Sequence, residues 1–415
     1  MDRSNLPFRR RTVIKAFGAI GGIGGVSGSV SANRHSTRSR APRLELVGHT
    51  VLGPRDGANT HGAVNEDLDL AAVGSFVSVD PESRIIDISD PENPEMTATI
   101  ETGFGGDIRN TDIHPTKPLV FTANEGPGEG NWAIVDAEDK NDPELIGNFT
   151  VDGASSGTHN VQAYTHGDDD FLITCGHGRG FVVFNINDPE EPEEVYHFQE
   201  GSHTVHAAHV QGDFAYLAHW NAGLWIIELG DLSDPEVVAS FDYREEEADV
   251  PLRACHHTVP HPSNDLVLLG EEVGGGRPGY KHLVEYDLNG GETELLSSFQ
   301  FPQHANQPTG RQGFWWTGHF SDWGVGDQED VIFSGDYKAG VQVFDASDPE
   351  DPVRIDQYMP TEGVGEIRRE DPERLDLLDN VPFTWGAESQ LAGDSGRVYA
   401  ADATTGFYVL ELQGY

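Results

Sequence analysis

The sequence repeats one short pattern seven times: an apolar strand followed by a tight turn. Residues 84–94 (RIIDISDPENP) are the first clear copy, and an Asp-Pro turn follows most of the other strands. A repeat of this length with several strands per copy is typical of a β-propeller, in which the number of copies gives the number of blades. We therefore predict an all-β fold, a seven-bladed β-propeller. The remaining copies open at Trp132, Phe181, Leu224, Leu283, Val341 and Phe407.

The two ends of the repeat region predict how the ring closes. Residues 42–50 (PRLELVGHT) resemble residues 143–150 (PELIGNFT), the outermost strand of the second copy, whereas the chain stops after residues 407–412 without an outer strand of its own. We expect residues 43–52 to complete the blade that begins near the C-terminus. This closure removes two sheet edges that would otherwise promote aggregation. The propeller is thus predicted to span residues 43–415 as a single domain.

Charge composition restricts the partners of this chain. Its 70 acidic and 26 basic residues give a formal net charge of -44, and only five residues are lysine. A strongly acidic, lysine-poor surface is typical of proteins adapted to concentrated salt, where screening makes the self-repulsion tolerable. The same charge argues against nucleic acid as a partner, because lysine and arginine are needed to neutralise the phosphates.

The first 32 residues resemble an export signal rather than part of the fold. Residues 10–15 (RRTVIK) resemble a twin-arginine motif, a glycine-rich apolar stretch follows, and residues 30–32 (VSA) fit a small-residue cleavage site. We expect residues 1–32 to be a twin-arginine signal peptide, residues 33–42 a linker, and the mature protein to be secreted or at the cell surface. No later run of residues predicts a transmembrane segment.

The repeat motif resembles that of a known family. An apolar strand, the turn Asp-Ile-Ser-Asp-Pro and a second Pro are similar to the LVIVD-repeat family, with the best matches at residues 84–94, 181–192 and 341–352. The fifth blade departs from the motif, because residues 289–292 (NGGE) replace the Asp-Pro turn. The resemblance implies a propeller, often in a secreted or surface protein, and no established activity. The motif itself is structural, since Asp caps the turn and Pro presets its backbone.

Aligning the blades reveals polar residues that recur near the start of the first strand. Residues 157–161 (GTHNV), 201–205 (GSHTV) and 255–259 (CHHTV) are similar to one another. The first strand of a propeller blade lies next to the central axis, so these positions are expected to meet there. The predicted axial ring comprises His61, Asn110, His159, His206 or His203, His257, His319 and Glu388.

Two histidines compete for the ring position in the fourth blade. The spacing of His159 from its second strand favours His203, whereas the spacing of His257 from its second strand favours His206. Side chains alternate along a strand, so both cannot face the axis if one regular strand holds them. The count that favours His206 requires no insertion, and we prefer it.

The predicted ring suits a transition metal. Imidazole is a ligand for copper, iron and zinc, and an open coordination position would permit chemistry on dioxygen, water or a small substrate. In a structural alternative, each histidine is a clamp that hydrogen-bonds a neighbouring strand. Polar residues at the ends of the second strands share the same face and could orient the imidazoles or bind a ligand. They are Asn124, Glu125, His177, His219, Trp220, Glu271, Glu272, Asp336, Tyr337 and Asp402.

Three further residues are predicted to be structural. Cys175 and Cys255 fall in the third and fifth blades, which do not touch, so we expect buried thiols rather than a disulfide. His209 follows His206 by three residues and is expected to point away from it into strand packing.

Two functions of different classes remain. In the first, the protein is an exported binding or interaction module, its partner is a protein or a small-molecule ligand, and the histidine-lined axial face is structural. In the second, it is a metal-dependent enzyme, for instance an oxidoreductase, with His159, His206, His257 and His319 as the main ligands of copper, iron or zinc and with His61 and Glu388 as supplementary ones. We expect the binding module first, because the family resemblance brings no chemistry.

Overall fold

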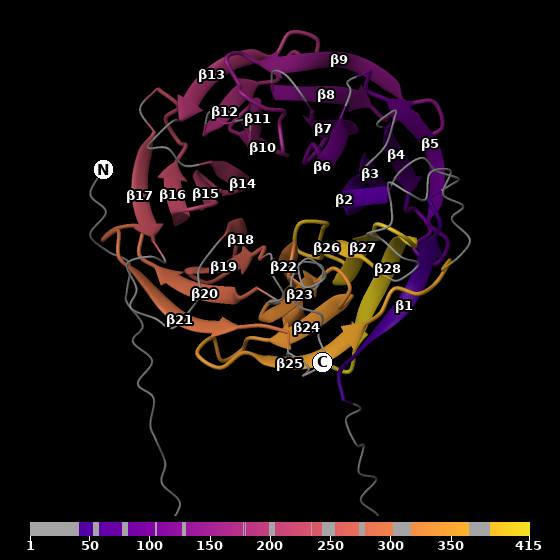
Figure 1. Cartoon of the computed structure of the whole chain (residues 1–415), viewed down its shortest axis with the longest axis vertical. Helices are drawn as coiled ribbons and strands as arrows, with labels where there is room; N and C mark the ends of the chain where they lie inside the picture. Colours follow the sequence, from indigo (N-terminus) through magenta and orange to yellow (C-terminus); the bar gives the residue numbers. More distant parts are fainter. Residues whose placement is uncertain are drawn as a thin grey trace, which may run out of the picture. The chain divides into compact units, whose positions relative to one another are not determined.

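The computed structural model arranges seven four-stranded antiparallel sheets around a common centre (Figure 1), which confirms the predicted seven-bladed β-propeller. The residues that it describes are 41–52, 58–76, 82–103, 106–126, 130–176, 178, 180–198, 204–233, 235–242, 254–273, 279–301, 317–364 and 382–415. The predicted signal peptide, most of the predicted linker, His177 and His203 lie outside these ranges.

Each blade runs from an innermost to an outermost strand. Blade 1 contains β2 (Ala58–Asn65), β3 (Leu70–Phe76), β4 (Glu82–Asp87) and β5 (Glu95–Glu101). Blade 2 contains β6 (Asp107–Ile113), β7 (Leu119–Glu125), β8 (Gly130–Asp136) and β9 (Glu144–Val151). Blade 3 contains β10 (Asn160–His166), β11 (Asp169–Cys175), β12 (Phe181–Asn185) and β13 (Glu193–Phe198). Blade 4 contains β14 (Val205–Gln211), β15 (Phe214–His219), β16 (Gly223–Glu228) and β17 (Glu236–Phe241).

The last three blades follow the same order. Blade 5 contains β18 (Cys255–Pro260), β19 (Leu266–Glu271), β20 (Lys281–Tyr286) and β21 (Thr293–Phe299). Blade 6 contains β22 (Ser321–Trp323), β23 (Val331–Gly335), β24 (Val341–Asp345) and β25 (Val353–Tyr358). Blade 7 contains β26 (Thr384–Glu388), β27 (Arg397–Asp402), β28 (Gly406–Gln413) and, outermost, β1 (Arg43–Thr50).

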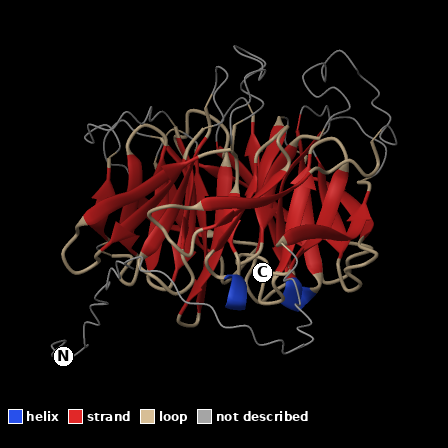
Figure 2. Cartoon of the chain, turned by 90° about the horizontal axis from the view of Figure 1, so that it is seen from below, coloured by secondary structure: helices blue, strands red, loops and turns tan. Residues whose placement is uncertain are grey.

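The propeller has two distinct faces. We call the upper face the side where the innermost strands begin and the lower face the side where they end. The 3₁₀ turns η1 (Glu66–Leu68) and η3 (Gly326–Gln328) follow β2 and β22 and lie on the lower side of the molecule in Figure 2. No helix in the described part of the chain is long and apolar enough to cross a membrane.

The N-terminal strand closes the ring, as the sequence predicts. In the antiparallel pairing of β1 with β28, Arg43 lies opposite Gln413 and Thr50 opposite Phe407. Leu44 is 4% exposed and packs into the cluster between blades 6 and 7. Its backbone N–H also donates a hydrogen bond to Asp356 of β25 over 2.6 Å. β1 therefore completes blade 7 and ties it to blade 6.

Apolar side chains between neighbouring sheets form the core. Trp132 of β8 is fully buried and packs on Phe149 of its own blade and on Phe184 of blade 3, with ring centroids 4.7 and 4.9 Å apart. Cys175 and Cys255 are buried free thiols in two different interblade clusters, in agreement with the prediction. Each blade thus depends on its neighbours for burial.

Turn chemistry explains the Asp-Pro repeat. In blade 1, Asp87 accepts a hydrogen bond from the backbone N–H of Ser89 (3.0 Å), and Asp90 accepts one from Glu92 (3.1 Å). The same pair of caps recurs in blades 2, 3 and 6, with Asn in place of the first Asp in blade 3. The repeat therefore encodes turns of the lower face, away from the upper end of the axis.

Candidate functional site

An irregularity near the start of the innermost strand re-aims one side chain in several blades. The register between the first two strands shifts by one residue in blades 2, 4, 5 and 7. A bulge of this kind leaves one residue unpaired and turns its side chain in a new direction. The residues left out of the pairing are Arg109, His206, His256 and Trp385.

Four imidazoles from consecutive blades form a row at the upper end of the axis. The ring centroids of His159 and His206 are 4.3 Å apart, those of His206 and His256 are 4.2 Å apart, and those of His256 and His319 are 4.1 Å apart. The structure therefore brings together three of the histidines that the sequence predicted. The blade 5 member is His256 and not the predicted His257.

Backbone carbonyls fix the orientation of two of these rings. Nδ1 of His206 lies 2.7 Å from the carbonyl oxygen of His256, and Nδ1 of His319 lies 2.7 Å from that of Trp385. A carbonyl oxygen only accepts, so Nδ1 carries the hydrogen in both rings and Nε2 of the neutral ring keeps its lone pair. The bond to the next blade is the clamp of the structural alternative, and it leaves one nitrogen of each ring for a ligand role.

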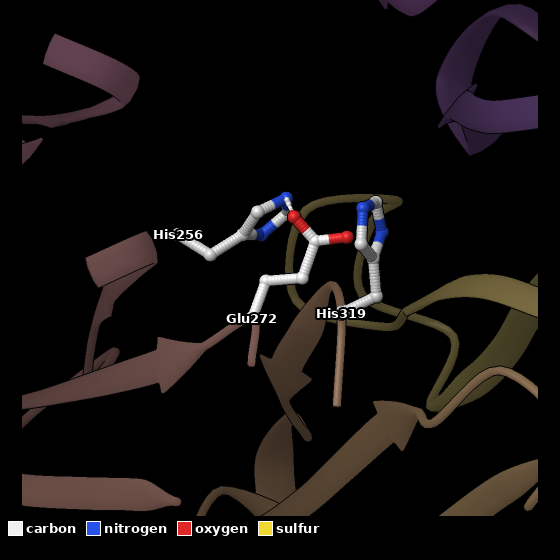
Figure 3. Close-up of side chains that lie close together, drawn as sticks. All are labelled: His256, Glu272 and His319. Carbon is white, nitrogen blue, oxygen red and sulfur yellow. Dashed lines mark ion pairs between the residues drawn. The ribbon is translucent and has the colours of Figure 1, made fainter. Parts of the chain in front are cut away.

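The imidazole of His256 is buried and, among the described residues, has no hydrogen bond at either ring nitrogen. Its Nε2 lies 3.9 Å from Oε2 of Glu272, which follows β19. One ligand atom each from His256, Glu272 and His319 lie within 4.8 Å of one another (Figure 3). Two imidazoles and a carboxylate in this arrangement are a set of donors that could hold a metal ion.

Tyr337 holds the carboxylate of Glu272. The Tyr337 hydroxyl donates a hydrogen bond to Oε1 of Glu272 over 2.7 Å. Tyr337 is 2% exposed and has a φ of 37°, a left-handed conformation that non-glycine residues rarely adopt. Strain of this kind persists only where the surrounding structure imposes it. Burial raises the pKa of Glu272, against the hydrogen bond from Tyr337, which lowers it.

Burial keeps three imidazoles of the row, those of His206, His256 and His319, neutral. It lowers the pKa of His206, His256 and His319 well below the usual value, and the neighbouring imidazoles lower it further. A protonated imidazole cannot bind a metal, so these neutral rings are in the ligand form at pH 7.

At the blade 3 end of the row, His159 contacts a charged side chain of blade 2. His159 Nδ1 lies 3.3 Å from Oε1 of Glu125, and Arg109 Nε lies 2.6 Å from Oε2 of the same carboxylate. Burial acts to raise the pKa of Glu125, but the hydrogen bond and charge of His159 and the charge of Arg109 lower it to about 2. Glu125 is therefore ionised and anchors His159 at the rim of the site.

A cavity of about 230 Å³ opens beside these groups on the upper face. We call it the upper cavity. Its wall is partly aromatic, which suits a small organic ligand. It is lined by Phe76, Arg109, Asn110, Glu125, His159, Glu272, His319, Phe320, Tyr337 and Trp385.

Phe320 divides the predicted ring into two groups. Its ring lies 4.9 Å from that of His256 and 4.1 Å from that of His61, and it lines both the upper cavity and a second cavity toward the lower face. His61, His257 and Glu388 line the second cavity and not the upper one. These three predicted ring members thus lie around a different cavity from His319.

Hydrogen bonds within this second group occupy both nitrogens of His61. Asn110 Oδ1 accepts from the backbone N–H of Val161 over 3.1 Å, so its amide nitrogen must donate to Nδ1 of His61, 3.2 Å away. His61 Nε2 then carries the hydrogen and lies 3.0 Å from Oε1 of Glu388. His61 has no nitrogen left for a metal. In blade 5, His257 Nε2 accepts from the backbone N–H of Ser321 over 3.1 Å.

Sequence reasoning missed His256 because the bulge cannot be read from spacing. Counting back from the second strand leads to His257, and the extra residue in β18 moves the axial position to its neighbour. Glu388 was aligned as a ring member but lies at the end of β26, where Trp385 holds the upper position. The only available signal was the His256-His257 doublet itself.

Glu272 and Tyr337 were predicted as second-strand residues of this face, and the structure places both in the site.

The sheets, their closure and the position of this site define the molecule as a seven-bladed β-propeller. Solved structures with which it shares the fold include a functionally unknown protein from Desulfotomaculum acetoxidans (TM-score 0.53, 15% identity, 72% of this chain and 85% of that chain). They also include the β-propeller domain of Cps50 (Swd1) from Myceliophthora thermophila (0.55, 11%, 88% and 98%) and a putative 6-phosphogluconolactonase from Bacteroides uniformis (0.54, 12%, 71% and 85%). At these identities the likeness concerns the fold alone.

More particularly, two segments match the family model of the LVIVD repeat: residues 77–102, in blade 1, and residues 205–243, in blade 4. These matches support the resemblance that the strand-and-turn motif indicates. A comparison with curated proteins gives no match. A β-propeller with LVIVD repeats is consistent with an interaction module, and the chemistry must be argued from the site itself.

Proposed function

We propose that the protein binds a transition-metal ion at the upper end of the propeller axis, through His256, His319 and Glu272. The observation that carries this proposal is the buried imidazole of His256, whose two ring nitrogens have no hydrogen-bond partner in the described part of the chain. A buried polar group without a partner costs about 1–3 kcal/mol. A metal ion between His256 and Glu272 would satisfy it.

The donor set limits the identity of the ion. Imidazole nitrogen suits zinc, copper and iron, and two histidines with one carboxylate form the ligand set of non-haem iron sites with open positions. His206, next in the row, keeps an unprotonated Nε2 and could approach the same ion. Copper, iron and zinc are therefore the candidates.

The upper cavity suggests what a bound ion would do. Glu272 and His319 line this cavity, so a small molecule in it would lie beside their ligand atoms. A bound ion would supply Lewis acidity or, if it is iron or copper, redox chemistry on water, dioxygen or a small substrate. Arg109 and Glu125 at the rim would contact a polar ligand, and Trp385 would contact an apolar part. The binding-module function then becomes the binding of a small molecule next to a metal.

Metal analysis of the full-length protein tests the proposal. Protein purified without chelator, or reloaded with Cu²⁺, Zn²⁺ or anaerobic Fe²⁺, should hold about one ion per chain, and EDTA should lower its melting temperature. His256→Ala should lose the ion and the effect of EDTA.

His261→Ala is the matched control. His261 is a fully buried histidine of the same blade, but it lies in a turn on the lower face, where its Nδ1 accepts from the backbone N–H groups of Ser263 and Asn264. This variant should lose stability and keep the metal. A wild-type protein that retains none of the three metals after loading, or a His256→Ala variant that retains as much as the wild type, would refute the proposal.

We also propose that the protein is exported by the twin-arginine pathway and works in concentrated salt outside the membrane. The RRTVIK motif at residues 10–15 and the net charge of -44 support this. Replacing both Arg10 and Arg11 with Lys should retain the precursor inside the cell. An unchanged extracellular yield would contradict the export route, and a melting temperature that does not rise with salt would contradict the adaptation.

A further inference from the structure

A second cavity lies on the propeller axis on the other side of Phe320 from the metal site. Its volume is about 280 Å³, and the innermost strands of all seven blades contribute to its wall. We call it the lower cavity. The metal site proposed above lies at the upper end of the axis, and its ligands His256, His319 and Glu272 are not the residues that carry the inference about this lower cavity.

The lower cavity has acidic side chains and, among the described residues, neither lysine nor arginine. Asp67, Asp112 and Glu388 line it. Asp112 Oδ2 accepts hydrogen bonds from the backbone N–H of Ala163 (2.5 Å) and from the Gln162 amide (3.3 Å), which fix the carboxyl in the wall.

Asp112 and Glu388 interact electrostatically. Burial raises the pKa of Asp112 to about 8, with a contribution from the charge of Glu388 and against backbone hydrogen bonds that lower it. Glu388 is bonded to a neutral His61, so its own negative charge is not cancelled. With this pKa Asp112 is mostly protonated at pH 7. A cation bound beside it would favour its ionised form, so that both carboxylates would then hold the cation.

His209 provides independent evidence for a ligand. It lies on β14, is 6% exposed and lines the lower cavity, and no hydrogen bond to its ring is found among the described residues. The expectation that His209 points into strand packing is therefore wrong. A buried imidazole facing a cavity without a partner is a group that a bound molecule would satisfy.

We propose that the lower cavity binds a small organic cation, with its ammonium group held by Asp112 and Glu388 and its apolar part packed on Val161 and Val259. An organic cation fits better than a bare metal ion, because calcium and magnesium need six or more oxygen ligands and much of this wall is apolar. The volume admits a molecule with a single ring. The proposal is independent of the metal site.

Calorimetry with a matched pair of probes tests this inference. Benzylammonium should bind to the full-length protein, whereas benzyl alcohol, which has nearly the same shape and no charge, should bind at least tenfold more weakly. Asp112→Asn and Glu388→Gln should each weaken benzylammonium at least tenfold. His256→Ala should bind it as the wild type does, so failure of the metal proposal would leave this result unchanged.

Crystallography locates the probe even if a variant does not fold. In wild-type crystals soaked with 4-bromobenzylammonium, the anomalous signal of bromine should lie in the lower cavity. The inference would be overturned if benzyl alcohol bound equally well or if both carboxyl variants bound benzylammonium undiminished. It would also be overturned if the protein preferred Ca²⁺ to benzylammonium or if the bromine signal lay elsewhere.

Discussion

His209→Leu should make the protein less sensitive to acid. The buried imidazole of His209 has a pKa lowered by burial from 6.5 to about 4. Between these two pH values the unfolded chain binds a proton on His209 that the folded protein does not bind. Proton binding thus favours the unfolded state, and stability falls as the pH falls from about 6.5 to about 4.

The size of this effect follows from the two pKa values. Each pH unit between them costs about 1.4 kcal/mol, and the unfolded imidazole is already mostly neutral at pH 7. Between pH 7 and pH 5, His209 alone should therefore remove about 2 kcal/mol from the free energy of unfolding. The leucine variant lacks this titration. It should be close to wild type at pH 7 and lose about 2 kcal/mol less than the wild type on going to pH 5.

Denaturant unfolding at pH 7 and pH 5, at one salt concentration, measures this difference. Val259→Ala is the control, because it alters the same cavity wall without a titratable group, and its effect should be equal at the two pH values. If the wild type and His209→Leu lose the same stability between pH 7 and pH 5, within about 0.5 kcal/mol, the reasoning about His209 is wrong.

Two further substitutions test the fold. Leu44→Ala should lower the free energy of unfolding by about 2–5 kcal/mol, because Leu44 is buried where β1 closes the ring. Leu46→Ala, at a site 39% exposed on the same strand, should change it by less than about 0.5 kcal/mol, and equal effects would contradict the closure. Lys281→Met should cost about 3–5 kcal/mol, because Lys281 pairs with the fully buried Asp336 at 2.9 Å. Adding Asp336→Leu should restore part of this loss; a double variant less stable than Lys281→Met would argue against an unpaired charge as the cause.

The fold could be read from the sequence because its information is repeated. Seven copies of one strand-and-turn motif give the blade number, and the turn chemistry of Asp87 and Asp90 is local enough to be recognised in single residues. The closure by residues 43–52 was also predictable. The first strand had no blade of its own, and the last blade had no outermost strand.

The site could be predicted only in part from the sequence, because a bulge of a single residue determines which side chain of a strand faces the axis. His159, His206 and His319 were found by their place before the second strand. His256 was missed because the bulge in β18 depends on packing between blades and has no signature in spacing. Phe320 was also invisible as a partition, since its role comes from contacts with rings of blades 1 and 5.

The pairing of β1 with β28 has a consequence for the order in which the protein can be made. β1 leaves the ribosome before any blade is formed, and its partner β28 is synthesised after the other six blades. Blade 7 must therefore wait for β28, and until then β1 presents an unpaired edge to other strands. Bringing together two strands so far apart in the sequence is a late and slow step, and the seven-bladed ring is closed only when that step is done.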